Sequence, residues 1–356
     1  MKFGVYIGPI YPGDMGGAEA FDFSLAITRT AHESGFDGIF VAHHHLLGPS
    51  HMVLNPFLTL ARMSAEFPGG YLGTACFQVP LAHPVQLAEA TALLDVMSGG
   101  RFLFGVGQGY RKAEFESLGI SRPERSARLA EAVQAIRALW TGQSASFEGR
   151  FYRFENVSIR PTPIQRPGPP VWVGADTVPT VARVPDIGDA WVASGRHTRT
   201  FIREALPGYR ARLEELGRPF EGLPLFRELH VADDSRRAEE GMKDALRAQY
   251  ESYARWGQPG ERYDLDFDQL KEERILVGAP EEVAERVMEY RDEFDVPFMW
   301  FRLYYPGMDP ELALETIRLF GEVIPLFRQQ AQTREVAAPE TIVFLSLFHQ
   351  KSTRLS

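Results

Sequence analysis

The sequence predicts an α/β fold, a (β/α)8 TIM barrel with inserted segments on the face formed by the carboxyl ends of its strands. Short apolar runs typical of strands alternate with segments of helical period over most of the 356 residues, as in a parallel sheet with helical connections. About eight strand–helix units can be counted, the number that closes such a barrel. The longest interruption, residues 141–170, is followed by a return of the alternation, so we interpret it as an insertion.

The first four units are marked by their boundary residues. Gly35 stands at the expected end of the first helix, where a left-handed residue is favoured, and Pro84 stands at the first turn of the third. We expect strands at 2–7, 38–42, 71–77 and 101–106, and helices at 18–34, 56–66, 84–97 and 122–140.

The second half begins with the insertion. Its segment SFEGRFYRFENV alternates aromatic and polar residues around a glycine and precedes the proline-dense PTPIQRPGPP, which predicts a hairpin. We then expect strands at 171–173, 190–193, 224–231 and 298–304, and helices from 178 and at 199–216, 236–256, 281–294 and 310–327. Residues 257–273 are expected to form a mobile stretch.

The domain organisation follows from this series. Residues 1–328 are predicted to form a single barrel domain, and residues 329–356 a C-terminal tail. The tail contains TIVFLSLF, an apolar strand-like octamer outside the barrel count. We expect it to be disordered, of foreign origin, or paired with the sheet edge of a partner.

Composition narrows the function classes. The net charge of −9 argues against nonspecific binding to nucleic acid or to anionic membranes. The single cysteine excludes an intrachain disulfide framework, and the chain begins with the strand-like MKFGVYIG in place of a secretory signal. No apolar run approaches the roughly 20 residues that span a bilayer. Together these features predict a cytoplasmic protein without a membrane partner.

Three consecutive histidines end the second predicted strand. His43, His44 and His45 lie where the loops of a barrel converge on one pocket, and strand alternation directs at least one of them inward. An imidazole can take or give a proton near neutral pH, which favours a catalytic role. A metal site with His51 and His83 is the competing interpretation, but adjacent histidines on a strand diverge and no helical ligand spacing supports it. Polar residues satisfied by backbone or water are the structural alternative.

Small residues follow on the next two strands. The side chains of Gly73 to Cys76 leave room for a flat ligand, although a tightly packed barrel layer also needs small residues. The turn GVGQGYR, residues 105–111, brings backbone close to a potential ligand. It lacks the remaining glycine and the acidic residue of the dinucleotide fingerprint, so a Rossmann domain is not indicated.

A possible anion site follows the strand at 171–173. In VWVGADT the chain turns at Gly174 into a helix that begins near Val178, and backbone amides at a helix start can bind phosphate. The alternative is an ordinary helix cap by Asp176 or Thr177. Arg125 and Arg128, at the start of the fourth helix, could add positive charge, or could simply be solvated.

Longer segments resemble the bacterial-luciferase-like flavin monooxygenases. They occur in the family order and spacing from about Lys2 to about Phe327, namely GFDGIFVAHHH, GTACFQVPLAHP, LLDVMSGGRFLFGVGQGY, FEGRFYRFENVSIRPTPIQRPGPPVWVGAD, LVGAPEEVAERV and YYPGMDPELALETIRLFGEVIP. The resemblance implies a barrel that binds reduced FMN, or in some branches a deazaflavin, at its C-terminal mouth. It also implies oxygenation of a small organic substrate by O2 through a flavin C4a-peroxide, and a homodimer. A separate NAD(P)H:flavin reductase is expected to supply the reduced flavin.

The resemblance assigns roles to individual residues. His44 matches the catalytic histidine and His45 its neighbour, whereas His43 stands where many members have an acidic residue. Gly107 stands where the luciferases carry a reactive cysteine, so light emission is not implied. The resemblance also implies three groups of cofactor contacts. The strand pair Ala75-Cys76, often joined by a non-proline cis bond in the family, would support the flavin ring, and Gln108, at the position of a phosphate-contacting arginine, would bind the cofactor together with Gly109 and Tyr110. The phosphate turn comprises Gly174, Ala175, Asp176 and Thr177, and Arg128 is a looser match.

Three other functions remain open at this stage. A deazaflavin-dependent dehydrogenase would transfer hydride without oxygen, and a non-catalytic flavin-binding paralogue would bind the cofactor alone. A zinc hydrolase is the weakest alternative. Residues 46–53, 141–170 and 257–273 are expected to border the pocket, but they mix aromatic and polar character and select no particular substrate.

Overall fold

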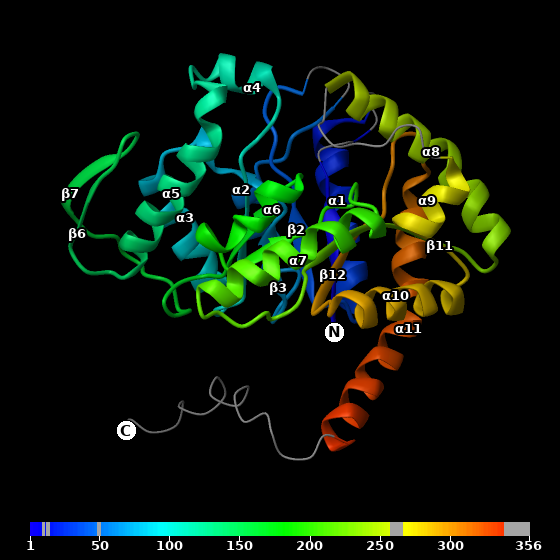
Figure 1. The fold of residues 1–356 in the computed structure, drawn as a ribbon. Coiled ribbons are helices and arrows are strands. Elements are labelled where there is room, and N and C mark those ends of the chain that lie inside the picture. Colours follow the sequence, from blue (N-terminus) through cyan, green and yellow to red (C-terminus); the bar gives the residue numbers. More distant parts are fainter. Residues whose placement is uncertain (9–10, 12–14, 48–50, 257–265, 338–356) are drawn as a thin grey trace, which may run out of the picture.

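The computed structural model describes residues 1–8, 11, 15–47, 51–256 and 266–337. A parallel sheet curls around a central axis, and helices cover its outer surface (Figure 1). The barrel strands are β1 (Lys2–Ile7), β2 (Gly38–Val41), β3 (Tyr71–Thr74), β5 (Phe102–Gly107), β8 (Val171–Gly174), β9 (Ala190–Val192), β10 (Leu225–Val231) and β12 (Phe298–Arg302). The predicted TIM-barrel class is confirmed.

The barrel closes between β9 and β10. The order of paired strands runs β10-β12-β1-β2-β3-β5-β8-β9, and every pairing in it is parallel. A bridge between Ala193 and Leu225 joins the two ends, because the Ala193 N–H donates to Pro224 O (3.0 Å) and the Phe226 N–H donates to Ala193 O (2.9 Å). All strand carboxyl ends therefore meet at one rim, where the following loops can form a single site.

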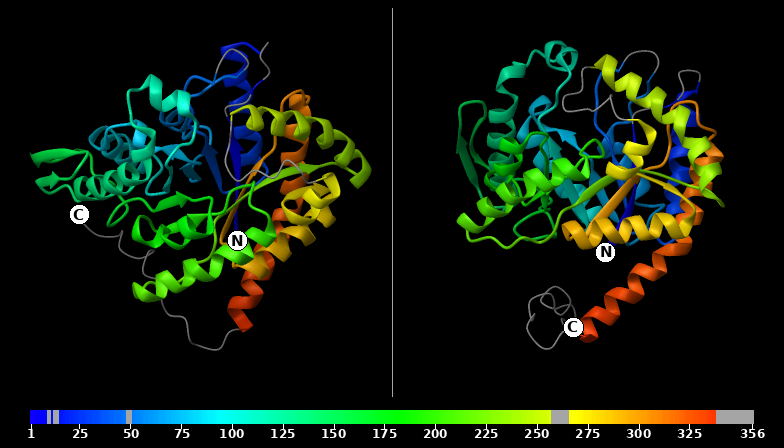
Figure 2. Two further views of the ribbon diagram at one scale, coloured as in Figure 1. Left: turned by 45° about the horizontal axis from the view of Figure 1, so that its top comes forward. Right: turned by 45° about the vertical axis from the view of Figure 1, so that its right-hand side comes forward.

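The helices form the outer layer, as both views in Figure 2 show. Local signals set their starts: the Asn55 side chain accepts from the backbone N–H groups of Phe57 and Leu58, and Thr198 accepts from that of Phe201. The principal helices are α1 (Gly17–Glu33), α2 (Pro56–Met63), α3 (Pro84–Met97), α5 (Arg125–Trp140), α6 (Val178–Ala182), α7 (Arg199–Glu215), α8 (Ser235–Trp256), α10 (Pro280–Phe294) and α11 (Pro310–Ala337).

The predicted hairpin in the insertion is confirmed. Strands β6 (Ala145–Glu148) and β7 (Arg153–Val157) pair antiparallel and lie beside α5, away from the barrel axis (Figure 1). The Glu131 carboxylate of α5 holds the loop by accepting from the backbone N–H groups of Arg150, Phe151 and Tyr152.

Several short helices, strands and turns were not predicted from the sequence. These are β4 (Phe77–Gln78), α4 (Lys112–Ser117), β11 (Ile275–Gly278), and the 3-10 turns Val79–Leu81, Arg122–Glu124 and Val184–Asp186. The expectation of a mobile stretch at 257–273 is wrong for its second part, because Asp266 caps a regular helix, α9 (Phe267–Glu273). Residues 257–265 lie outside the described residues. Each missed element is too short to show a clear hydrophobic period.

Aromatic side chains fill the barrel interior below the rim. The Phe40 ring stacks on Trp300 with centroids 4.6 Å apart, and Trp172 stacks on Trp300 at 5.8 Å. Gly73 makes room for this layer, since a Cβ there would lie 2.5 Å from the Phe40 ring. The packed layer forms the floor of the cavity above it.

The C-terminal helix is longer than expected. It was predicted to end at residue 327, but α11 continues to Ala337. The octamer TIVFLSLF lies in 338–356, outside the described residues. In the described part of the chain, no helix has the length and apolar character needed to cross a bilayer.

Candidate active site

A cavity of about 260 Å³ opens at the carboxyl-end rim of the barrel. It brings together side chains from most of the barrel strands and the loops that follow them, as the sequence predicted. The cavity is lined by Tyr6, His43, His44, Ala75, Cys76, Gln78, Gly107, Gln108, Gly109, Tyr110, Arg122, Arg125, Gly174, Asp176, Val192, Ser194, Gly195, Arg196, Phe226, Glu228, Trp300 and Arg302.

His44 forms an ion-pair contact with a carboxylate from a distant part of the chain. Its Nδ1 lies 3.0 Å from Oε1 of Glu114, on α4, and the Glu114 side chain is fully buried. α4 therefore supplies a carboxylate to His44, although His43 stands where many family members have an acidic residue. The sequence does not indicate Glu114 as this partner, because 70 residues separate it from His44.

Glu114 Oε1 is a shared acceptor. It also receives the His45 backbone N–H at 2.8 Å, the Gln78 Nε2 at 3.2 Å and the Arg111 Nη1 at 3.4 Å. Burial raises the pKa of Glu114, but the contacts with His44, the His45 backbone and Gln78 outweigh it and hold the pKa at about 2. Glu114 is thus a carboxylate at neutral pH.

This charge fixes the tautomer of His44. A carboxylate can only accept, so Nδ1 of His44 carries the proton and donates it to Glu114. Nε2 is then the basic atom of the neutral ring.

Gln78 links the two strands beneath this pair. Its Nε2 donates to His43 O (2.9 Å) and to Glu114 Oε1 (3.2 Å), which fixes the orientation of the amide because both partners only accept. Its Oε1 is buried without a partner and belongs to a side chain that lines the cavity. Oε1 can therefore accept a hydrogen bond from a bound molecule.

The other two histidines have different surroundings. The His43 ring stacks on Phe77 at 3.9 Å, and its Nδ1 accepts from the Gln78 backbone N–H. Burial, together with His45 and His44, lowers the pKa of His43 to about 3, so the ring is neutral. His45 is not among the cavity-lining side chains and meets the site through its backbone; burial lowers the pKa of its ring.

A metal-ligating arrangement is not found in the described part of the chain. No three His, Cys, Asp or Glu residues are grouped there so that they could hold an ion. The rings of His43 and His45 lie 4.5 Å apart at a steep angle, and the His83 side chain caps α3 by accepting from the Val85 N–H.

The strand pair Ala75-Cys76 also lines the cavity and is joined by a non-proline cis peptide bond. Beside it, Gly107 and Gly174 keep the wall flat: a Cβ on Gly107 would lie 3.4 Å from Cys76 Cβ, and one on Gly174 would lie 3.3 Å from Cys76 Sγ. Burial raises the pKa of Cys76 to about 12, so its thiol is not a nucleophile. The wall suits a flat ring system.

The residues after β5 form the next part of the rim. Gln108, Gly109 and Tyr110 all line the cavity, and Gln108 Oε1 accepts from the Ser126 hydroxyl. Gly109 has a φ of +73° and lies against Gln78, where a Cβ would meet Oε1 at 2.5 Å. A side chain at this position is therefore excluded twice, by conformation and by space.

The four residues of the turn after β8 have different surroundings. Gly174 and Asp176 line the cavity, but Thr177 caps α6 and Ala175 is buried, with its carbonyl accepting from Trp191. The Asp176 carboxylate pairs with Arg196 and His197. Burial raises the pKa of Asp176, but Arg196 and His197 outweigh it and lower the pKa overall, so the carboxylate is charged and is paired with the Arg196 cation, which also lines the cavity.

Four of the described residues that line the cavity are arginines, and two of them, Arg196 and Arg302, are paired with Asp176 and Glu228. Arg122 and Arg125 line the cavity, and Arg125 Nε is buried without a partner. Burial, with the Arg122 charge, lowers the pKa of Arg125. Arg128 is turned away, because it pairs with Glu124 at 3.0 Å and packs over Phe151. Arg122 was missed from the sequence, where a loop arginine carries no distinguishing signal.

These features fit a flavin nucleotide: the flat wall at Ala75-Cys76 for the ring, the Arg122 and Arg125 side chains for a phosphate, and His44 within the same cavity. A barrel with such a rim site defines a flavin-type oxidoreductase.

Comparison with known proteins agrees with this class. The chain belongs to the luciferase-like monooxygenase family, whose family model matches residues 1–295. The F420-dependent glucose-6-phosphate dehydrogenase of Nakamurella multipartita is 30% identical, over 88% of this chain and 93% of its own. The alkanal monooxygenase alpha chain of Photorhabdus laumondii is 27% identical, over 71% of each chain.

A solved structure is also similar over most of its length. The monooxygenase RslO1 from Streptomyces bottropensis superposes with a TM-score of 0.82 at 27% identity, covering 92% of this chain and all of that one. The family thus includes monooxygenases and F420-dependent dehydrogenases among the relatives of this chain.

Proposed function

We propose that the protein is an FMN-dependent monooxygenase that uses reduced FMN and O2 to oxygenate a small organic substrate. The observation that carries the proposal is the His44–Glu114 pair, which faces a cavity with a flat wall and a cationic rim. The similarity to the monooxygenase RslO1 over 92% of the chain supports it.

The residues have distinct parts in this reaction. Reduced FMN, when bound, supplies the electrons that activate O2. Ala75, Cys76, Gly107 and Gly174 would support its ring, and Arg122 and Arg125 its phosphate. His44 Nε2 takes or gives the proton at the reacting centre, and Glu114 orients the ring through its contact with Nδ1. The rings of Tyr6, Phe226 and Trp300 would supply an apolar wall beside the reacting centre.

The proposal extends to the partners of the reaction. A separate NAD(P)H:flavin reductase supplies the reduced flavin, and the chain acts as a cytoplasmic homodimer. Exposed apolar side chains offer a candidate surface for pairing, because Leu58 of α2 is 73% exposed, and Leu93 and Met97 of α3 are 48% and 44% exposed.

A screen of oxygen consumption tests the function. Purified protein is supplied with chemically reduced FMN and a panel of organic compounds, and substrate-dependent oxygen use is measured. We expect wild type and the exposed control variant His32→Ala to respond to the same compounds, and His44→Ala to lose most of the response while retaining FMN. Equal turnover and coupling in His44→Ala would contradict the proposal.

A deazaflavin-dependent dehydrogenase is the second candidate. It is favoured by the 30% identity, over 88% of this chain, with an F420-dependent dehydrogenase. The same compounds are incubated anaerobically with oxidised deazaflavin. Substrate-dependent reduction of the deazaflavin, with no oxygen use in the first assay, would replace the monooxygenase proposal.

A further inference from the structure

The inner wall of the cavity is aromatic with one charged pair. The rings of Tyr6 and Phe226 are 4.8 Å apart, and Phe226 stacks on Trp300 at 6.1 Å. The Arg302 guanidinium lies 5.2 Å from the Tyr6 ring centre. Flat apolar faces of this kind bind flat apolar rings.

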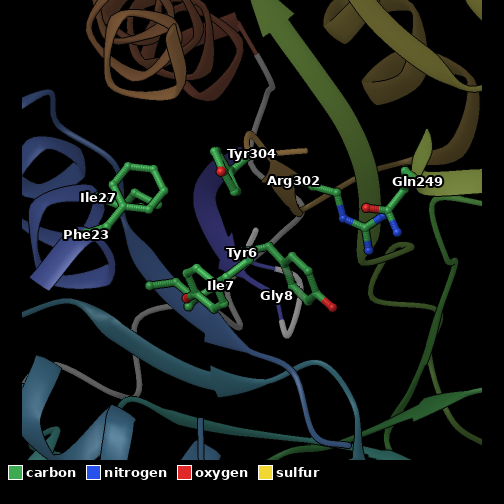
Figure 3. A pocket seen from close by; sticks show the side chains of 9 residues that line it. Tyr6, Ile7, Gly8, Phe23, Ile27, Gln249, Arg302 and Tyr304 are labelled. Atoms are coloured by element: carbon green, nitrogen blue, oxygen red, sulfur yellow. The ribbon is translucent and has the colours of Figure 1, made fainter. Parts of the chain in front are cut away.

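A second, small cavity adjoins this wall (Figure 3). It measures about 20 Å³, and Tyr6 and Arg302 line it as well as the large cavity. Gln249, from α8, lines it too, and Figure 3 shows its carboxamide on the same side as the Arg302 guanidinium. The remaining wall is mostly apolar and comprises Ile7, Gly8, Tyr11, Phe23, Ile27 and Tyr304.

Gln249 is unusual because its amide is unsatisfied. The side chain is fully buried, and neither Oε1 nor Nε2 has a hydrogen-bond partner. A buried amide without partners is costly, and buried polar groups are nearly always paired. Gln249 therefore offers one donor and one acceptor to a molecule that reaches the small cavity.

The positive and negative charges beside the small cavity, which we call the subsite, balance each other. Arg302 pairs with Glu228 at 3.3 Å, and Glu228 also accepts from the Tyr250 hydroxyl at 2.8 Å. A carboxylate ligand would meet the Glu228 charge and could not donate to Gln249 Oε1. A neutral group that both accepts and donates is complementary, and a cavity of this size admits only the few atoms at the edge of a ligand, such as those of an amide group.

We propose that the substrate is a flat aromatic molecule with a neutral carboxamide or lactam edge. Its ring lies against Tyr6, Phe226 and Trp300, its N–H donates to Gln249 Oε1, and its carbonyl oxygen accepts from Gln249 Nε2 or Arg302. The inference rests on the proposed function only in taking this cavity as the substrate site.

The binding of three naphthalene compounds of similar shape tests the proposed preference for an amide. Isothermal titration calorimetry compares 2-naphthamide, 2-acetylnaphthalene and 2-naphthoate on the protein with oxidised FMN and without it. The amide should bind roughly fivefold more tightly than the ketone, because one neutral hydrogen bond is lost, and roughly tenfold more tightly than the carboxylate.

The variant Gln249→Met keeps the side-chain length and removes both polar atoms. It should bind the amide and the ketone equally, with the ketone affinity little changed, whereas the exposed control Gln143→Met should behave as wild type. Equal binding of amide and ketone by wild type, or an unchanged preference in Gln249→Met, would overturn the inference. A preserved preference without oxygen transfer would refute the proposed function and leave the subsite standing, because calorimetry does not depend on turnover.

Discussion

Replacing Glu114 by glutamine tests the reasoning about His44 most sharply. The amide keeps the shape of the side chain and one acceptor oxygen, but it removes the negative charge that faces His44 Nδ1 at 3.0 Å. A hydrogen bond to a charged group contributes about 1.5–3 kcal/mol, and one between neutral groups about 0.5–1.5 kcal/mol. The difference of roughly 1–1.5 kcal/mol corresponds to about a 5- to 12-fold lower kcat.

Two further variants give an upper limit and a control for this effect on kcat. Glu114→Ala leaves the donors of His44, His45 and Gln78 without their acceptor, so a loss of roughly 100-fold or more is expected. Glu116→Gln changes a glutamate of the same helix whose side chain is 62% exposed, and it should leave kcat unchanged.

The assay is steady-state oxygen consumption with reduced FMN and saturating substrate. Because Glu114 acts through His44, kcat should fall while KM for the organic substrate stays nearly constant. A wild-type kcat in Glu114→Gln, or a rise in KM alone, would refute the assignment of Glu114 as the positioning residue of His44.

Three other predictions concern binding, pH and packing. Arg125→Met should weaken FMN binding by roughly tenfold or more but leave riboflavin binding unchanged in calorimetry, because only FMN carries a phosphate; equal losses for both would contradict the rim assignment. His43 has a folded pKa of about 3, below its unfolded value of 6.5, so the unfolded state binds the extra proton between these values and stability falls as pH decreases through that window. In urea unfolding, the wild type should lose about 1 kcal/mol more stability than His43→Asn between pH 7 and 5.5, because the other buried histidines contribute equally to both proteins; parallel curves would contradict the prediction. Phe40→Ala should cost about 3–5 kcal/mol of unfolding free energy by opening the ring stack on Trp300, and a cost below about 1 kcal/mol would show that the layer is not close-packed.

The barrel was predictable because short apolar runs alternate regularly with helices that are long enough to show their period. Each of the eight strands named in advance corresponds to a barrel strand, and the hairpin was recognised from its alternation around a glycine. β11 (Ile275–Gly278) is as long as β2 and β3 but was missed, because it lies beyond the closed barrel, paired with β10, and so adds a strand to the eight that the barrel pattern predicts. α4, with six residues, has no apolar stripe of its own, and its importance comes from the one carboxylate that it buries.

The candidate site was predictable only in part. His44 and the Ala75-Cys76 pair could be placed because they end strands whose register is fixed by the sheet. Glu114, Gln78 and Arg302 could not, since their roles depend on contacts between segments far apart in the sequence. In the turn after β8, where either Asp176 or Thr177 could have capped the helix, Thr177 forms the cap. The Asp176 carboxylate therefore faces the cavity and pairs with Arg196.

The central claim is that the protein transfers an oxygen atom from O2 to an organic substrate. The most direct measurement supplies reduced FMN and ¹⁸O₂ in ordinary water and analyses the product by mass spectrometry. We predict a product that carries one ¹⁸O atom in wild type, and in a much smaller amount in His44→Ala. A product without ¹⁸O, formed equally well under anaerobic conditions with a deazaflavin, would contradict the claim.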